Sequence, residues 1–111
     1  MQLISRNAIY YELLTDVGEI VGAVFAVNHC KYIEIVDLFV NKEFQNLGHG
    51  RALLRTILNS FPHNSICLRC EASENGLTQD ELAAWYRRWD FEDGSPFHEG
   101  DGWMHKSPRI I

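Results

Sequence analysis

The chain has 111 residues, with 10 Lys and Arg against 15 Asp and Glu, a hydrophobic fraction of 46% and three cysteines. This length and composition predict one globular domain over residues 1–111 and exclude a disordered or coiled-coil chain. The net charge of -5 argues against non-specific binding of nucleic acid, and no apolar run approaches the roughly 18 residues that a membrane span needs.

The N-terminus and the cysteine count predict a cytoplasmic protein. Residues 1–6 (MQLISR) lack the apolar stretch of a signal peptide, and an odd number of cysteines favours reduced thiols. The excess acid is concentrated in residues 57–111, which hold 5 basic and 9 acidic side chains. Such a charge distribution favours a cationic substrate.

The first half of the chain has the pattern of three strands. Residues 8–15 (AIYYELLT) are rich in β-formers and end at the turn signal Asp16-Val17-Gly18. Residues 19–28 and 31–40 follow as further strands, and Gly22 inside the second of them predicts a bulge or a close backbone approach. The short connections favour an antiparallel meander.

The apolar period changes at residue 49. Between residues 49 and 61 the apolar side chains recur at spacings of three and four, which predicts one buried helix face, and Pro62 ends that helix. Residues 65–72 (SICLRCEA) alternate, as a strand does. A helical crossover from the third strand leads to this one, so the two strands should run parallel.

A second helix and two short strands complete the order. Thr78 and Glu81 form a capping box at the helix start. Its apolar face consists of Leu82, Trp85, Tyr86 and Trp89. Residues 90–92 and 103–106 have the pattern of short strands around the loop 94–102. The order βββ-α-β-α-β-β predicts an α+β fold with a mixed, mostly antiparallel sheet and two main helices.

Residues 40–51 (VNKEFQNLGHGR) carry the motif with chemical meaning, where a strand ends and a helix begins. Glycines let the backbone turn sharply and let a ligand approach the amides. The free N–H groups of a first helical turn suit a pyrophosphate, and Lys42 and Arg51 would add positive charge. The spacing fits neither G-x-G-x-x-G nor G-x-x-x-x-G-K-[ST], which excludes the dinucleotide-binding and P-loop motifs.

Two segments resemble signatures of the GNAT superfamily of acetyl-CoA-dependent N-acetyltransferases. Gln45-x-x-Gly48-x-Gly50 resembles the family's Q/R-x-x-G-x-G/A signature, and residues 85–91 (WYRRWDF) are similar to its L/F-Y-x-x-x-G-F element. The order of elements also fits, so the resemblance covers roughly residues 8–106. It implies a GNAT-like fold, acetyl-CoA as the cofactor and a primary amine as the acceptor.

The resemblance also assigns roles to residues. Backbone groups of Leu38, Phe39 and Val40 would bind the pantetheine arm or the oxyanion, and the third and fourth strands would splay to admit the cofactor. Tyr86 would protonate the departing thiolate. The alternative interpretation is that Tyr86 is an aromatic residue of the core without a catalytic role. The pyrophosphate would lie on the backbone of Gln45, Asn46, Leu47, Gly48, His49, Gly50 and Arg51.

The sequence departs from the family pattern in three places. Asp90 stands where the second signature has Gly, and the position seven before Tyr86, often Asn, is Gln79, with Asn75 as an alternative. The family usually begins with a strand and two helices that cover part of the acceptor groove, whereas only about seven residues precede the first strand here. The acceptor side is therefore expected to be open, or closed by another subunit of a homodimer.

Acetyl transfer to an amine needs a neutral nucleophile, and a lysine amine has a pKa of ~10.4, so a nearby carboxylate is useful. Glu34 and Asp37 have odd spacing on the third strand, which predicts that they face opposite sides. Glu34 is the first choice for the general base, because residues 34–36 (EIV) are similar to the histone-acetyltransferase segment that carries it. Asp37 is the alternative and Glu71 a weaker one.

No Cys–His or Ser–His pair stands at a suggestive spacing, which favours direct transfer over a covalent acyl-enzyme. Cys67 and Cys70 have the C-x-x-C spacing of a metal or redox pair, but odd spacing on a strand sends the thiols to opposite faces. We therefore expect no metal site.

The sequence thus predicts an N-acetyltransferase acting on a small-molecule or protein amine, such as a lysine or an N-terminus. Two alternatives stay open: a non-catalytic acyl-CoA-binding or interaction module, and a phage-type regulator that acetylates a host protein.

Overall fold

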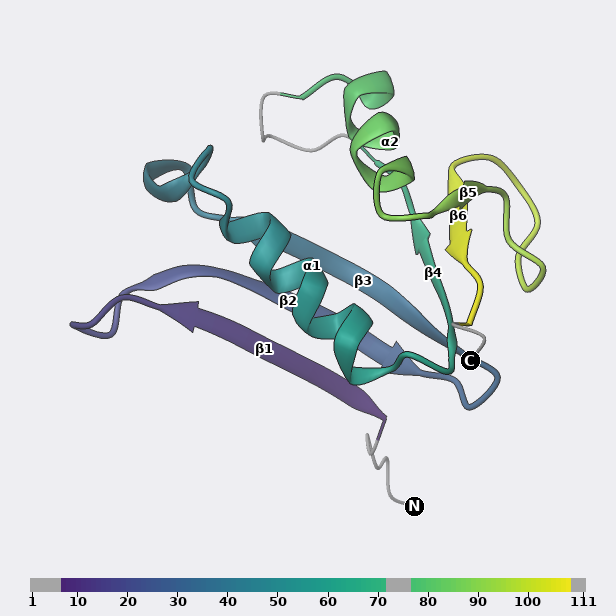
Figure 1. Ribbon diagram of the computed structural model, residues 1–111, viewed down its shortest axis with the longest axis horizontal. Coiled ribbons are helices and arrows are strands. Elements are labelled where there is room, and N and C mark those ends of the chain that lie inside the picture. Colours follow the sequence, from purple (N-terminus) through teal and green to yellow (C-terminus); the bar gives the residue numbers. More distant parts are fainter. Residues whose placement is uncertain (1–6, 72–76, 109–111) are drawn as a thin grey trace, which may run out of the picture.

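A computed structural model describes residues 7–71 and 77–108 (Figure 1). The strands are β1 (Ala8–Leu14), β2 (Ile20–Asn28), β3 (Tyr32–Val40), β4 (Ser65–Arg69), β5 (Glu92–Asp93) and β6 (Trp103–Lys106). The helices are α1 (His49–Ser60), α2 (Gln79–Arg87) and the short 3-10 helix Lys42–Phe44. One sheet contains all six strands in the order β1-β2-β3-β4-β6-β5. Only β3 and β4 pair in parallel, so the α+β prediction with a mostly antiparallel sheet is confirmed.

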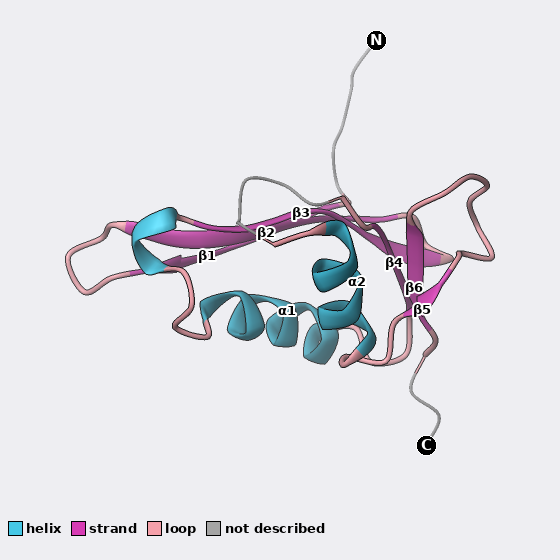
Figure 2. Cartoon of the chain, turned by 90° about the horizontal axis from the view of Figure 1, so that it is seen from above, coloured by secondary structure: helices cyan, strands magenta, loops and turns pink. Residues whose placement is uncertain are grey.

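Both α1 and α2 lie on the same face of the sheet, as Figure 2 shows. The core forms between this face and the helices, and its fully buried side chains include Val24, Ile33, Leu54 and Phe91. Burying such side chains contributes about 1.5–3 kcal/mol each. On the other face no described helix covers the sheet, and Tyr10 and Leu14 are 52% and 51% exposed.

A bulge in β3 resets the alternation of its side chains. Ile35 pairs with Ala26 and Asp37 pairs with Phe25 of β2, so Val36 is an extra residue. The core-facing positions of β3 are accordingly 33 and 35 before the bulge and 38 and 40 after it. The prediction that Glu34 and Asp37 face opposite sides is therefore wrong. The extra residue shifts the alternation of side chains by one, so both residues lie on the same face of the sheet.

The parallel pairing of β3 with β4 ends at the same place. Its last pair is Ile35 with Leu68, yet β3 continues to Val40. Strand β4 ends at Arg69, earlier than the predicted residue 72, and beyond it the Cys70 amide donates to the Gly102 carbonyl, 2.6 Å away. The two strands therefore separate beyond Ile35, and this leaves the β4-facing edge of β3 open.

The second helix begins as predicted. The Glu81 amide donates to Thr78 Oγ1 (3.1 Å), and the Thr78 amide donates to Glu81 Oε1 (3.0 Å), which completes the capping box. After the helix, Asp90 has a φ of 68°, in the left-handed region. Asp is among the residues that tolerate this conformation, so it can occupy the position where the family signature has Gly.

Gly22 of β2 is the glycine that the packing requires. It lies opposite Val40, and a Cβ at this position would collide with the Phe39 carbonyl oxygen and come within 3.0 Å of Val40 Cα. Both neighbours are backbone atoms that no rotamer change can move. The close backbone approach predicted from the sequence is confirmed.

We expect Gly22→Ala to lower the free energy of unfolding by about 2–3 kcal/mol, because the end of β3 must shift to admit the methyl group. The matched control is Gly50→Ala. A Cβ there meets Val40 Cγ2 at 3.7 Å, an ordinary contact, and Ala in a helix gains up to ~1 kcal/mol over Gly. Urea unfolding measures both; equal stability of the Gly22→Ala variant and wild type would contradict the close packing.

No helix among the described residues is long and apolar enough to cross a membrane.

Candidate functional site

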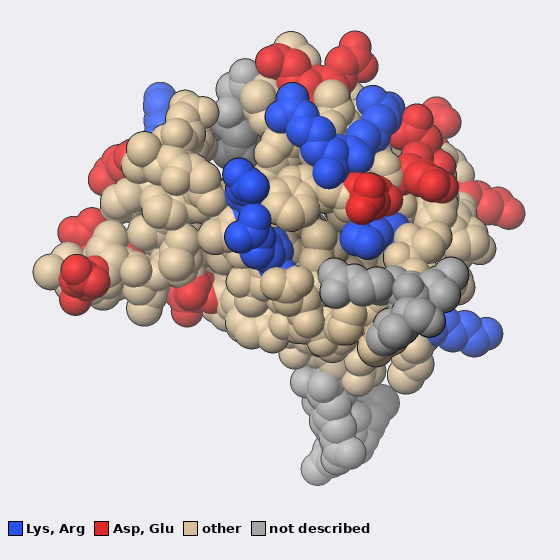
Figure 3. All heavy atoms as spheres, viewed as in Figure 1, with Lys and Arg blue, Asp and Glu red and all other residues tan. Residues whose placement is uncertain are grey.

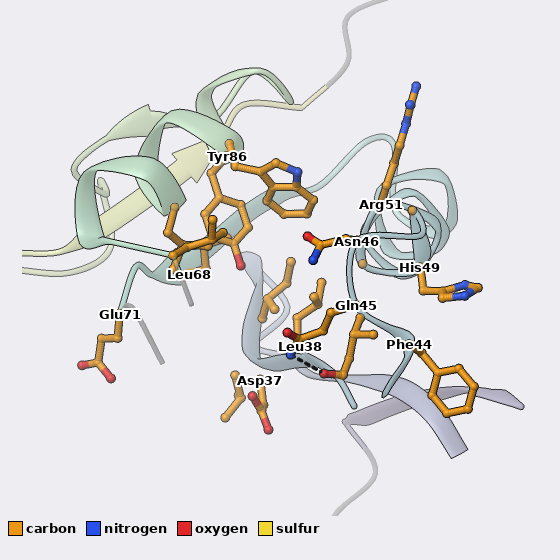
Figure 4. Close-up of a pocket in the computed structure, with 18 of the residues that line it drawn as sticks. Asp37, Leu38, Phe44, Gln45, Asn46, His49, Arg51, Leu68, Glu71 and Tyr86 are labelled. Atoms are coloured by element: carbon orange, nitrogen blue, oxygen red, sulfur yellow. Dashed lines mark hydrogen bonds between the residues drawn. The ribbon is translucent and has the colours of Figure 1, made fainter. Parts of the chain in front are cut away.

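A cavity of about 550 Å³ opens between β3, β4 and the two helices, where the strands separate (Figure 4). Its volume falls within the ~300–1,000 Å³ typical of small-molecule sites. The walls come from the end of β3, the residues that lead into α1, the end of β4 and the inner face of α2.

The open edge of β3 offers backbone hydrogen-bonding groups to this cavity. The Asn41 amide donates to the Val21 carbonyl of β2 (2.8 Å), and the Phe39 carbonyl lies against Gly22 of β2. Backbone groups alternate sides along a strand, so those of Leu38 and Val40 face away from β2. An extended ligand can pair with them as an added strand would.

The segment leading into α1 supplies the opposite wall. Gly48 precedes the helix with a φ of 86°, a left-handed conformation that favours glycine. The amides of the first helical turn then have no intrahelical acceptor, and that turn carries no acidic side chain. Gln45 Nε2 donates to the Val40 carbonyl (3.1 Å; dashed line in Figure 4), which ties this segment to the end of β3. The arrangement suits an anionic group.

Tyr86 reaches from α2 into the cavity (Figure 4). The residue is only 8% exposed, and its ring packs edge-on against Trp85 and Phe91. The hydroxyl makes no hydrogen bond to the described residues, and no described side chain has a fully buried polar atom without a partner, so the oxygen opens to the cavity. Burial, with smaller contributions from Cys70 and Asp37, raises the pKa of Tyr86 to about 12.

The structure separates the candidate carboxylates. Asp37 and Glu71 line the cavity, and Asp37 is close enough to raise the pKa of Tyr86. Glu34 does not line the cavity. Its Oε1 lies 3.0 Å from His29 Nε2. Burial, and after it the charge of Glu34, raises the pKa of Tyr32, whose ring stacks between His29 and Phe97.

A sequence comparison with protein families matches residues 6–93 to the family described as "Acetyltransferase (GNAT) domain". The chain belongs to the GNAT family. No curated protein sequence matches the chain significantly.

Solved structures, among them two N-acetyltransferases, share the fold. The Escherichia coli ribosomal-protein-S18-alanine N-acetyltransferase superposes with a TM-score of 0.74 at 16% identity, over 96% of this chain and 72% of that one. The PaiA N-acetyltransferase of Thermoplasma acidophilum in complex with coenzyme A gives 0.67 at 15% identity, over 91% and 61%. The anti-CRISPR protein AcrVA5 gives 0.71 at 19% identity, over 91% of this chain and 99% of that one.

Most of the GNAT cofactor residues expected from the sequence line the cavity. These are Leu38, Val40, Gln45, Asn46, Gly48, His49, Gly50 and Arg51. Phe39, Leu47 and Gln79 do not line it: the Phe39 carbonyl lies against Gly22 of β2, Leu47 is 68% exposed, and Gln79 Nε2 donates to the Cys70 carbonyl. Asn75 lies outside the described residues.

Other residues of the cavity wall were not predicted. Leu82 and Trp85 share the apolar face of α2 with Tyr86, and this helical spacing is a signal that could have found them. No sequence signal marks Val36 or Arg69 as residues of the cavity wall. Val36 is the extra residue of the bulge in β3, and Arg69 is the last residue of β4.

The two neighbouring thiols of this GNAT chain lie on opposite faces of the sheet, as predicted. Cys70 belongs to the core beneath the helices, whereas Cys67 is buried on the other side and accepts a hydrogen bond from Ser95 Oγ (3.4 Å). Burial raises the pKa of both thiols, which makes them weak nucleophiles. No group of three or more His, Cys, Asp or Glu side chains in the described ranges could hold a metal ion.

The raised pKa of Tyr86 predicts a change of stability at high pH. The folded state favours the protonated phenol, so this stabilisation is complete below the usual value of 10.0 and is lost as the pH rises through about 12. We expect the free energy of unfolding of the wild type to fall by about 1.4 kcal/mol per pH unit more than that of Tyr86→Phe in this window. Urea unfolding at a series of pH values measures the difference; parallel curves would contradict the buried, cavity-facing position.

Proposed function

We propose that this GNAT chain is an N-acetyltransferase that moves an acetyl group from acetyl-CoA directly to a primary amine. One observation carries the proposal: the open edge of β3, the amides at the start of α1 and the hydroxyl of Tyr86 all meet in one cavity. We also propose that residues 1–111 form a single cytoplasmic domain of this kind.

The residues present fit an acyl-CoA. Leu38 and Val40 offer backbone groups to the amide-bearing pantetheine arm, and the first turn of α1 offers N–H donors to the pyrophosphate. Nothing lies within 4 Å of a Cβ placed on Gly48, so the space beside this residue is open. When bound, the cofactor supplies an acyl group activated as a thioester. The similarity to a GNAT structure that contains coenzyme A supports this assignment.

Asp37 is the carboxylate best placed to accept a proton from the acceptor ammonium. It lines the cavity, and its charge is close enough to Tyr86 to contribute to the raised pKa of that phenol. Glu34, the sequence's first choice, is bonded to His29 instead. With an amine pKa of ~10.4, removing that proton raises the fraction of reactive neutral amine at neutral pH. A backbone N–H of Leu38 or Val40 would stabilise the negative charge that develops on the transferred carbonyl oxygen.

Tyr86 serves as the hydrogen-bond donor to the departing sulfur. A phenol with a pKa of about 12 is fully protonated at neutral pH. Complete proton transfer to a thiolate with a pKa of ~8.5 is uphill from such a phenol, so its contribution is to stabilise the developing negative charge by hydrogen bonding. The raised pKa thereby modifies the sequence-based expectation of a full proton donor.

Calorimetry with acetyl-CoA, followed by an acetyl-transfer assay on amines, tests the proposed function. We expect binding at micromolar concentration, and loss of binding in Gly50→Leu, whose side chain would project toward Val40 and Leu38 of the cavity wall. Binding without transfer to any amine would favour the alternative of a non-catalytic acyl-CoA-binding module. Absence of binding would contradict both.

A regulator that acetylates a host protein is the second candidate function. Its support is the similarity of fold to AcrVA5, an anti-CRISPR protein, over 91% of this chain and 99% of that one. The sheet face opposite the helices has exposed apolar side chains and could receive a protein acceptor or a second subunit. Mass spectrometry of lysate proteins incubated with labelled acetyl-CoA would identify an acceptor, and light scattering would measure the oligomeric state.

A further inference from the structure

Strand β1 forms one border of the sheet, and its outer edge is free in the described part of the chain. It stands last in the strand order and pairs only with β2. In Figure 1 no described helix or strand runs along its outer side. A free edge exposes N–H and C=O groups that can pair with another strand.

Alternate residues of β1 direct their backbone groups outward. The Asn28 amide of β2 donates to the Asn7 carbonyl (2.8 Å), one position before the first residue pair of the two strands. Hydrogen-bonded and non-hydrogen-bonded pairs alternate along an antiparallel ladder. The backbone groups of Ala8, Tyr10 and Glu12 therefore face away from β2, toward the free edge.

The sequence of β1 does little to protect this edge. Folded proteins protect edge strands with lysine, proline, a bulge or a very short strand. The strand Ala8–Leu14 (AIYYELL) spans 7 residues without lysine or proline, Glu12 is its one charged residue, and the register shift against β2 falls at its last residue. Figure 3 shows no Lys or Arg side chain along this border of the molecule. A second strand can therefore approach it.

The helix beside this border also leaves room for a partner. Ser60 Oγ of α1 lies 3.3 Å from the Tyr11 hydroxyl of β1, so the row of α1 that contains Ala52, Thr56 and Ser60 faces β1. The hydroxyls of Thr56 and Ser60 bond to carbonyls of their own helix. The row is thus small, exposed and uncharged.

The two arginines of α1 point the other way. The guanidinium carbons of Arg51 and Arg55 lie 5.7 and 5.9 Å from the ring centroid of Trp89, which follows the end of α2. Two copies joined along β1 therefore do not bring these like charges together.

A two-fold axis at Tyr11 pairs the whole of β1 with itself. Residue 8 then lies opposite residue 14, and residue 10 opposite residue 12, so outward-facing backbone groups meet each other. Tyr10 of each copy faces Glu12 of the other, and a phenol hydroxyl can donate to a carboxylate. An axis at Tyr10 or Glu12 would pair fewer residues, and at Glu12 it would set two carboxylates opposite each other.

We propose that a second copy of this chain pairs with the free edge of β1, antiparallel and about a two-fold axis at Tyr11. The two sheets then form one continuous sheet, and the helices of both copies cover the same face of it. The inference is independent of the proposed function, because the cavity lies at β3 and β4, beyond β2 from this edge.

Sedimentation velocity over a range of concentrations tests the pairing. An interface of this kind is small, so we expect the wild type to dimerise with a dissociation constant of about 10 µM. Tyr10→Glu sets carboxylates opposite each other at two symmetric places and should weaken the dimer about tenfold. Adding Glu12→Lys to Tyr10→Glu turns both repulsions into attractions and should bring the dissociation constant within about threefold of wild type. Tyr10 is 52% exposed, so the folded chain accommodates a charged side chain there.

Phe25→Glu is the matched control. Phe25 of β2 is the residue opposite Tyr10 and is 36% exposed, but it lies one strand away from the edge. We expect its dissociation constant to stay within about twofold of wild type. A dimer that Phe25→Glu dissociates and Tyr10→Glu leaves intact would lie on the open sheet face and would overturn the inference.

Amide hydrogen exchange identifies the groups that pair. We expect the amides of Tyr10 and Glu12 to become protected as the protein concentration rises through the dissociation constant. Protection at every concentration would mean that another segment of the same chain covers the edge, which would overturn the inference. A wild type that stays monomeric at about 1 mM would do the same, as would a double variant that dimerises no better than Tyr10→Glu.

Discussion

Tyr86→Phe should lower the rate constant of acetyl transfer about a hundredfold and change acetyl-CoA affinity by less than about twofold. The phenol oxygen opens to the cavity and makes no hydrogen bond to the described residues, so its removal deletes only a contact to the ligand. The ring, which packs against Trp85 and Phe91, is retained. Single-turnover kinetics and calorimetry measure the two effects separately.

Tyr11→Phe is the matched control for this substitution. Its ring packs against the core from β1, and its hydroxyl lies 3.3 Å from Ser60 Oγ, outside the cavity. We expect full transfer activity in this variant. An unchanged transfer rate in Tyr86→Phe would mean that Tyr86 is a core aromatic without a catalytic role.

Asp37→Asn should lower kcat/KM about a hundred- to a thousandfold at neutral pH. Without the carboxylate, the reaction depends on the small fraction of amine that is already neutral. The remaining activity should therefore rise with pH toward the amine pKa of ~10.4, about tenfold per pH unit. A pH–rate profile of the wild type and the variant measures this change.

Glu34→Gln separates this assignment from the one that the family resemblance favours. Glu34 lies outside the cavity and is bonded to His29, so we expect a loss of less than about fivefold and an unaltered pH profile. The opposite result, a large loss in Glu34→Gln and a small one in Asp37→Asn, would make Glu34 the general base.

The α+β class and most element boundaries could be predicted because they depend on local patterns. Apolar spacing predicted α1 from residue 49, and Thr78 with Glu81 predicted the start of α2 through a capping box that the structure contains. The GNAT assignment depended on Gln45, Gly48 and Gly50, which have fixed spacing along the chain. Their geometry is local too, since Gly48 must adopt a positive φ before the helix.

The placement of the carboxylates could not be predicted in the same way. Strict alternation along β3 placed Glu34 and Asp37 on opposite faces, whereas the bulge at Val36 gives them the same one; what separates them is the end of the β3–β4 pairing at Ile35, because Glu34 lies before it and Asp37 beyond it. A bulge depends on how β3 pairs with β2, and its position has no mark in the sequence of β3 alone. The weaker candidate Glu71 likewise lines the cavity, two residues beyond the end of β4 at Arg69.

The sequence by itself thus determined the family, the order of the elements and the anion-binding segment, because these follow from short-range spacing. Only the tertiary structure decided which groups share the cavity. The separation of β3 from β4 beyond Ile35 and Leu68 brings Tyr86, Asp37 and the start of α1 around one space, and the packing of α2 brings Trp89 to Arg51 and Arg55. Contacts between segments about 30–50 residues apart depend on the folded chain as a whole, which local patterns do not describe.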